Sequence, residues 1–296
     1  MKQYLDKTFL QLGRGFQFSA DPPASLADRS NLGSKDPWTV LGCVLARARQ
    51  GDLGAVSSLP DLMARDNAAL VWNGCIQLIG FAGRQSFIFE TAKRFLARPE
   101  NAGVQWYVSD MMLNGCSLLA VEPLLTLHAA ATDRDARRHI EHCLSILLEE
   151  VPGDVYDGPE EQQVADPDYP EPFKQFQTLL DRPGYFDKVR TVAAEVAARL
   201  AHPQQAVTAG KPLDLQALTL YLYEHIRSGA DGTSRMEWAR MCFEASTGIA
   251  CSGFYDTNYR LQRLAALAVL EDFLEAAGAA RFEIGTRYFF GHAVER

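Results

Sequence analysis

The chain has 296 residues, 47% of them hydrophobic, and a formal net charge of −8 at pH 7. A chain of this length buries a sizeable core, as one elongated domain or as two compact ones. It contains no run of about 18 apolar residues and no apolar N-terminal stretch of the signal-peptide kind, so we predict a cytoplasmic protein without a membrane-spanning helix.

We expect residues 1–36 to form an irregular N-terminal segment. After it, tryptophan recurs every 34 residues, at Trp38, Trp72 and Trp106, and Ile140 takes the next place. A fixed period of this length is typical of stacked helix pairs. The alternative is an irregular helical bundle in which the aromatic spacing is coincidental.

Residues at the same offset from these positions also resemble one another. Three residues later the side chains are small or apolar (Leu41, Cys75, Ser109, Cys143), and six and seven residues later they are apolar (Val44, Leu78, Met112, Ile146; Leu45, Ile79, Leu113, Leu147). Offsets of 0, 3 and 7 share one face of a helix. We therefore predict that the first helix of each repeat buries a stripe that starts at the tryptophan position.

A second helix is expected in each repeat, near residues 52–65, 86–98 and 120–131. The best matching row in these helices is Leu62, Leu96 and Ala130. Pro123 is compatible with the last of them because proline is tolerated in a first helical turn.

Residues 38–42, Trp-x-x-Leu-Gly, resemble the opening of a tetratricopeptide repeat. That family needs small residues where its two helices cross, but the positions equivalent to Gly42 are Ile76 and Asp110. The closer resemblance is to HEAT-like repeats, which tolerate such variation. It implies an all-α fold, with a right-handed α-solenoid of HEAT-like helix pairs over residues 37–150.

The acidic excess is concentrated in one segment. Residues 149–171 carry nine carboxylates and no lysine or arginine, and prolines interrupt them. We therefore predict an acidic, proline-rich linker or loop at residues 151–172. It is either a solvated linker or an electrostatic contact for a basic partner. In the second case, the predicted partner-binding residues are Tyr156, Asp157, Glu160, Glu161, Asp168 and Tyr169.

Residues 173–296 are predicted to form a C-terminal helical region. Helices are expected after the Pro183-Gly184 break (Val189, Val192, Ala193, Val196, Leu200), over 213–227 (Leu215, Leu218, Leu222, Ile226), from the capping-box pattern Ser234-x-x-Glu237 to about 246, and over about 257–276 (Leu264, Leu267, Ala268, Leu270). The aromatic tail 281–294 is expected to hold a short extended segment packed on the last helix.

Motifs of enzymes are missing from the sequence: there is no nucleophile elbow, zinc-protease helix, phosphate-binding loop or dinucleotide fingerprint. We therefore predict no catalytic residues and no cofactor. His139, His142 and Cys143 form the best metal-binding pattern, but Cys143 falls on a core-facing position. We interpret them as a core thiol beside partly exposed histidines and predict no metal site.

Nucleic-acid binding is not predicted either, because acidic residues are interspersed among the basic ones (Arg84, Lys93, Arg94, Arg98, Arg134, Arg137, Arg138). The six scattered cysteines contain no CxxC pair and are read as reduced thiols.

The last motif is Arg-Tyr-Phe-Phe-Gly-His at residues 287–292. It resembles the closing motif of some immunity proteins of bacterial polymorphic-toxin systems; the alternative is an aromatic cluster that seals the core. The resemblance implies a non-catalytic protein that binds a toxin's catalytic domain, a basic protein partner, and neutralises it. The rival hypothesis is an enzyme or cofactor-binding domain with a site in a groove between the two halves, using Tyr255, Asp256, Tyr259 and Arg260.

Overall fold

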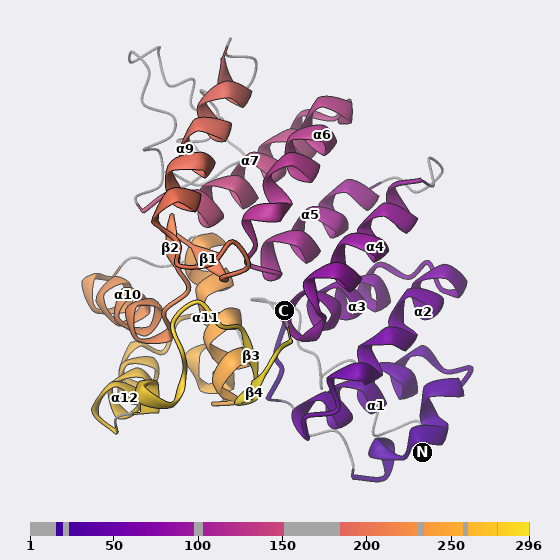
Figure 1. The fold of residues 1–296 in the computed structure, drawn as a ribbon. Coiled ribbons are helices and arrows are strands. Elements are labelled where there is room, and N and C mark those ends of the chain that lie inside the picture. Colours follow the sequence, from indigo (N-terminus) through magenta and orange to yellow (C-terminus); the bar gives the residue numbers. More distant parts are fainter. Residues whose placement is uncertain are drawn as a thin grey trace. The chain divides into compact units, whose positions relative to one another are not determined.

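The computed structural model describes residues 16–19, 24–97, 103–150, 184–229, 234–256, 260–276 and 278–295. These residues are mostly helical, and their strands are short and antiparallel (Figure 1). The all-α class is therefore confirmed. The acidic segment 151–172, with all six predicted partner-binding residues, lies outside the described residues.

The first half of the chain is a succession of helices: α1 (Pro37–Arg49), α2 (Leu59–Arg65), α3 (Ala69–Ala82), α4 (Gln85–Leu96), α5 (Val104–Asn114), α6 (Val121–Ala130) and α7 (Arg134–Leu148). Short 3-10 helices lie among them: η3 (Ala24–Ala27), η4 (Arg29–Gly33), η5 (Leu53–Ser58) and η6 (Leu118–Ala120). The bounds of α2 with η5, of α4 and of α6 fall close to those predicted for the second helices.

The second half contains α9 (Tyr185–Arg199), α10 (Leu215–Ser228), α11 (Ser234–Thr247) and α12 (Arg263–Glu275), with η8 (Ser252–Phe254) and η9 (Gly278–Arg281). Strand β1 (Val207–Thr208) pairs with β2 (Lys211–Pro212), and β3 (Tyr288–Phe289) pairs with β4 (His292–Ala293); Val207 lies opposite Pro212, and Tyr288 opposite Ala293.

The contacts divide the chain into two compact units. Unit 1 contains residues 1–87 and 214–296, and unit 2 contains residues 88–213. Each of the predicted ranges 37–150 and 173–296 therefore contributes to both units. In unit 2, α5 and α6 contact α7, which also contacts α9 and β1.

The predicted repeat columns are buried. Every residue three, six or seven positions after a repeat start is at most 4% exposed (Leu41, Cys75, Ser109, Cys143; Val44, Leu78, Met112, Ile146; Leu45, Ile79, Leu113, Leu147). These offsets keep one face of α1, α3, α5 and α7 toward the core, as helical periodicity requires.

The tryptophan position behaves differently, and the expectation of a buried stripe starting there is wrong for the third repeat. Trp72 and Ile140 are buried and Trp38 is half-buried, but Trp106 is 38% exposed. Trp106 lies in the first turn of α5, where its ring covers the side chain of His139 instead of entering the core. The second-helix row also fails in part: Leu62 is buried, whereas Leu96 and Ala130 are exposed.

The C-terminal predictions hold for α9, α10 and α11. The last helix begins at Arg263 rather than near residue 257, and Leu261, just before it, forms an antiparallel bridge with Tyr255. Of the predicted residues only Leu270 is buried, together with Ala266 and Phe273, whereas Leu264 is 85% exposed.

The predicted extended tail segment is the β3–β4 hairpin. It lies beside α11 and also contacts α3, rather than packing on the last helix (Figure 1). Phe289 is fully buried and meets Phe18 edge to face at 5.6 Å. Arg287 is buried and donates hydrogen bonds to the carbonyl oxygens of Gly80 and Gly83 at the end of α3. A cation at this position donates to carbonyl oxygens that have no partner within the helix, and its positive charge complements the helix dipole.

Candidate functional site

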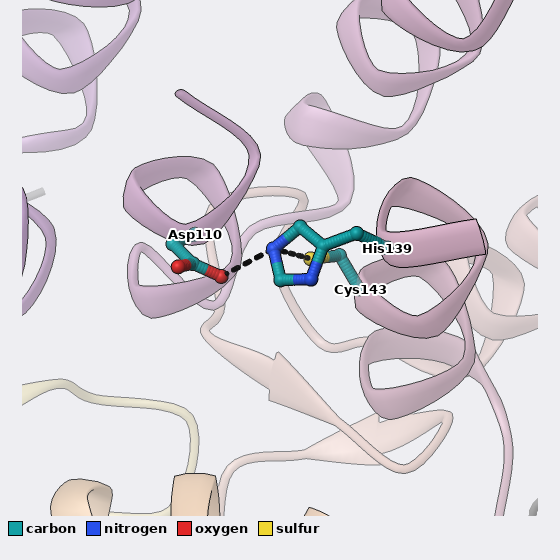
Figure 2. Close-up of side chains that lie close together, drawn as sticks. All are labelled: Asp110, His139 and Cys143. Atoms are coloured by element: carbon teal, nitrogen blue, oxygen red, sulfur yellow. Dashed lines mark hydrogen bonds and ion pairs between the residues drawn. The ribbon is translucent and has the colours of Figure 1, made fainter. Parts of the chain in front are cut away.

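Three chemically different side chains meet between two helices of unit 2. Asp110 comes from α5, and His139 and Cys143 lie one turn apart on α7 (Figure 2). The Oδ1 atom of Asp110 is 2.7 Å from Nε2 of His139, and Sγ of Cys143 is 3.8 Å from the same nitrogen. The three donor atoms all lie within 4.8 Å of one another. We call these residues the Asp–His–Cys cluster.

The cluster is closed on one side and open on the other. Cys143 is fully buried, whereas the side chain of His139 is 16% exposed and that of Asp110 is 31% exposed. Trp106 stacks on the imidazole ring of His139, with centroids 4.2 Å apart and planes inclined by 21°. Water therefore approaches the cluster from the side of Asp110.

Neighbouring charges set the protonation of His139. Burial alone would lower its pKa, but the Asp110 carboxylate and the Cys143 side chain raise it well above the usual value of about 6.5. Burial raises the pKa of Cys143, and the nearby His139 only partly offsets this effect. These shifts favour the protonated imidazole of His139 and the neutral thiol of Cys143 at neutral pH.

This arrangement is not that of a cysteine nucleophile. In such a site, an acid orients one imidazole nitrogen while the thiol donates its proton to the other. Here Asp110 and Cys143 both face Nε2 of His139, and the thiol has no exposed surface. The set of one nitrogen, one oxygen and one sulfur donor is instead suited to Zn²⁺ and related ions.

The structure changes the grouping predicted from the sequence. Of His139, His142 and Cys143, it brings the first and the last together and adds Asp110, while His142 is not part of the cluster. The interpretation of Cys143 as a core thiol is confirmed. Asp110 was missed as a partner because it lies 29 residues before His139, on another helix. The sequence offered one indication of Asp110. It places a carboxylate at the predicted helix-crossing position, 34 residues after Ile76.

A cleft opens beside the cluster. It has a volume of about 1120 Å³, lies wholly within unit 2, and is lined by residues of α4, α5, α6 and the start of α7. Three of its lining residues are large apolar side chains with exposed surface: Leu96 at 37%, Trp106 at 38% and Leu119 at 55%. Trp106 thus belongs both to the cleft wall and to the cover over His139.

Few charges lie in the cleft lining. They are Lys93, Glu122 and Asp133. Glu122 accepts two hydrogen bonds from Arg190 of α9, at 2.8 and 3.1 Å. Asp133 caps α7, accepting from the backbone N–H groups of Asp135 and Ala136. The cleft is therefore lined mainly by apolar side chains, and its two carboxylates already accept hydrogen bonds from other residues.

Two residues of the rival enzymatic hypothesis, Asp256 and Arg260, bond to each other. The N–H of Asp256 donates to the carbonyl oxygen of Arg260 at 3.0 Å, and the N–H of Arg260 donates to Oδ1 of Asp256 at 2.9 Å. Tyr255 is held in the bridge with Leu261. Tyr259 lies outside the described residues. The hydrogen bonds between Asp256 and Arg260 give these two residues a local structural role.

Comparison with protein-family models, curated proteins and solved structures finds no match to this chain. Among the described residues, none forms a helix that is both long enough and apolar enough to span a lipid bilayer.

Proposed function

We propose that the chain is a non-catalytic protein-binding module, built on a right-handed solenoid of HEAT-like helix pairs. We further propose that it acts as a cytoplasmic immunity protein, which binds the basic catalytic domain of a bacterial toxin and neutralises it. The observation that carries the proposal is the cleft of unit 2, where Leu96, Trp106 and Leu119 expose apolar surface together.

Exposed apolar side chains gathered in one hollow are uncommon on a monomeric protein and mark surfaces that bind something. Tryptophan is among the residues that contribute most to protein–protein affinity, especially when it fills a well-packed pocket. Trp106 suits this role because its stacking on His139 holds the indole in place before a partner arrives.

Charge favours a basic partner. The chain carries a net charge of −8, and the nine carboxylates of residues 149–171 account for the excess. Complementary potential accelerates the encounter of two proteins and excludes partners of the same sign. We propose that the acidic segment, through Tyr156, Asp157, Glu160, Glu161, Asp168 and Tyr169, guides the partner, and that the cleft supplies most of the affinity.

The experiment is to purify the tagged chain from its native host, identify the protein that co-purifies, and assay that protein's catalytic domain with and without the chain. We expect an equimolar amount of chain to abolish the activity. Trp106→Ala is expected to raise the Kd by about 30-fold, because a central aromatic contact contributes about 2 kcal/mol.

The matched control is Leu264→Ser, which removes a more exposed apolar side chain from α12 in unit 1 and should leave the Kd unchanged. The proposal fails if the co-purifying protein is not basic, if its activity is unaffected by the chain, or if Trp106→Ala binds as tightly as the control.

A further inference from the structure

We propose that Asp110, His139 and Cys143 form a binding site for a divalent transition-metal ion, with Zn²⁺ as the preferred ion. This inference is independent of the proposed function, because it concerns metal binding by the isolated chain. The observation behind it is that three different ligand types, brought from two helices, place one donor atom each within a sphere the size of a coordination shell.

The distances are close to those that a tetrahedral ion requires. Zn²⁺ binds sulfur at about 2.3 Å and nitrogen or oxygen at about 2.0–2.2 Å, which keeps neighbouring donors roughly 3.3–3.6 Å apart. The Nε2–Sγ distance of 3.8 Å must shorten by roughly 0.2 Å or slightly more, and Oδ1 and Sγ, which lie within 4.8 Å of each other, must also approach. The Oδ1–Nε2 distance of 2.7 Å must open by roughly half an ångström. Asp110 can supply that movement because its side chain is partly exposed.

The charges also balance. Binding removes the thiol proton of Cys143 and the proton between His139 and Asp110, and both protons pass to water. The bound ion carries two positive charges, and its thiolate and carboxylate ligands carry two negative ones. A neutral centre of this kind is compatible with a fully buried Cys143. The thiolate alone would be a costly isolated charge in that position.

The surroundings orient the ligands. Ser109 lies beside Cys143, whose pKa its hydroxyl helps to lower, and donates to the carbonyl oxygen of Gln105 at 2.8 Å. The stacked indole of Trp106 fixes the plane of the His139 ring. Such neighbours normally hold metal ligands in place. With three protein ligands in the cluster, the fourth position would be taken by water from the exposed side of Asp110. A sulfur ligand selects against Mg²⁺ and Ca²⁺.

The test uses Co²⁺ as a spectroscopic probe on purified full-length chain that has been treated with a chelator. We expect a sulfur-to-cobalt charge-transfer band, together with the intense visible bands of a four-coordinate ion, and loss of both on addition of Zn²⁺. Cys143→Ser should abolish the charge-transfer band. Asp110→Asn and His139→Gln should each weaken the apparent affinity by at least about 10-fold.

Cys75→Ser is the matched control, because Cys75 occupies the equivalent buried position on α3 in unit 1 and lies outside the cluster. Circular dichroism verifies that each variant is folded, and Asp110→Asn, which alters a partly exposed residue, remains informative if a core variant unfolds. The proposal is overturned if wild-type chain gives no charge-transfer band, if the band persists in Cys143→Ser, or if Asp110→Asn binds Co²⁺ like the wild type. In those cases the cluster is an ion pair that joins α5 to α7.

Discussion

All six cysteines are buried, and burial raises the pKa of four of them: Cys43, Cys75, Cys143 and Cys251. Cys75 is the simplest case: burial raises its pKa, and the nearby charge of Asp66 raises it further. Cys143 differs because His139 opposes the effect of burial. Cys75 and Cys143, which occupy corresponding predicted positions, thus have different chemical environments. Of these two, only Cys143 lies beside other side chains that could bind a metal ion.

The raised pKa of Cys75 predicts a pH-dependent loss of stability. Its thiol stays protonated in the folded chain but ionises in the unfolded chain above about pH 8.5, so its contribution is intact below that pH and is lost as the pH rises. Cys75→Ala removes this dependence. Relative to wild type, the variant should gain about 1.4 kcal/mol in free energy of unfolding between about pH 7.5 and about pH 9.5.

Urea unfolding at the two pH values measures this difference, with the pH-independent cost of the smaller side chain cancelling between them. A stability gap that is the same at both pH values would show that the Cys75 thiol ionises as freely in the folded chain as in the unfolded one.

At the scale of elements, the terminal motif at residues 287–292 is accounted for by the β3–β4 hairpin. Its two turn residues, Phe290 and Gly291, have φ angles of 49° and 79°, the positive values that suit the twist of a two-residue hairpin. Their N–H groups donate to the carbonyl oxygens of Ala245 and Ser246, at 2.7 and 2.8 Å. The turn therefore satisfies the end of α11, while Arg287 satisfies the end of α3.

The turn conformation predicts a penalty for a side chain at Gly291. A Cβ atom there would meet nothing within 4 Å, so Gly291→Ala tests backbone strain without a steric clash. We expect it to lower the free energy of unfolding by about 1–2 kcal/mol. Gly253→Ala is the control, since its Cβ would also meet nothing within 4 Å but its φ is not positive. Chemical denaturation compares the two, and equal effects would contradict the strained turn.

At the scale of the whole molecule, the distribution of charge matters more than its total. Replacing Glu160, Glu161, Asp166 and Asp168 by their amides should slow association with the basic partner and flatten the dependence of the rate on salt. Stopped-flow or surface-binding kinetics at several ionic strengths measure both effects.

The control removes the same amount of charge from four exposed carboxylates elsewhere (Asp61, Glu90, Glu195, Glu271). It should slow association less than the first variant does. Equal rates for the two variants at low salt would mean that the acidic segment has no steering role beyond its share of the net charge.

The order of the helices and part of their buried faces were predictable from the sequence, because helical periodicity is a local property, but Trp106, Leu96 and Leu264 are more exposed than expected. The residues three, six and seven positions after Trp38, Trp72, Trp106 and Ile140 are buried, and the stripe of α10 is buried as predicted. Each prediction needed only residues within one helix and the tendency of apolar side chains to leave water.

What the tertiary structure alone decided depends on residues far apart in the chain. Asp110 meets His139 because α5 packs against α7, and Trp106 is exposed because its ring lies over that histidine rather than under a neighbouring helix. Residues 214–296 return to join residues 1–87 in unit 1. Such pairings are set by which surfaces fit and bury together, and spacing along a single helix carries no information about them.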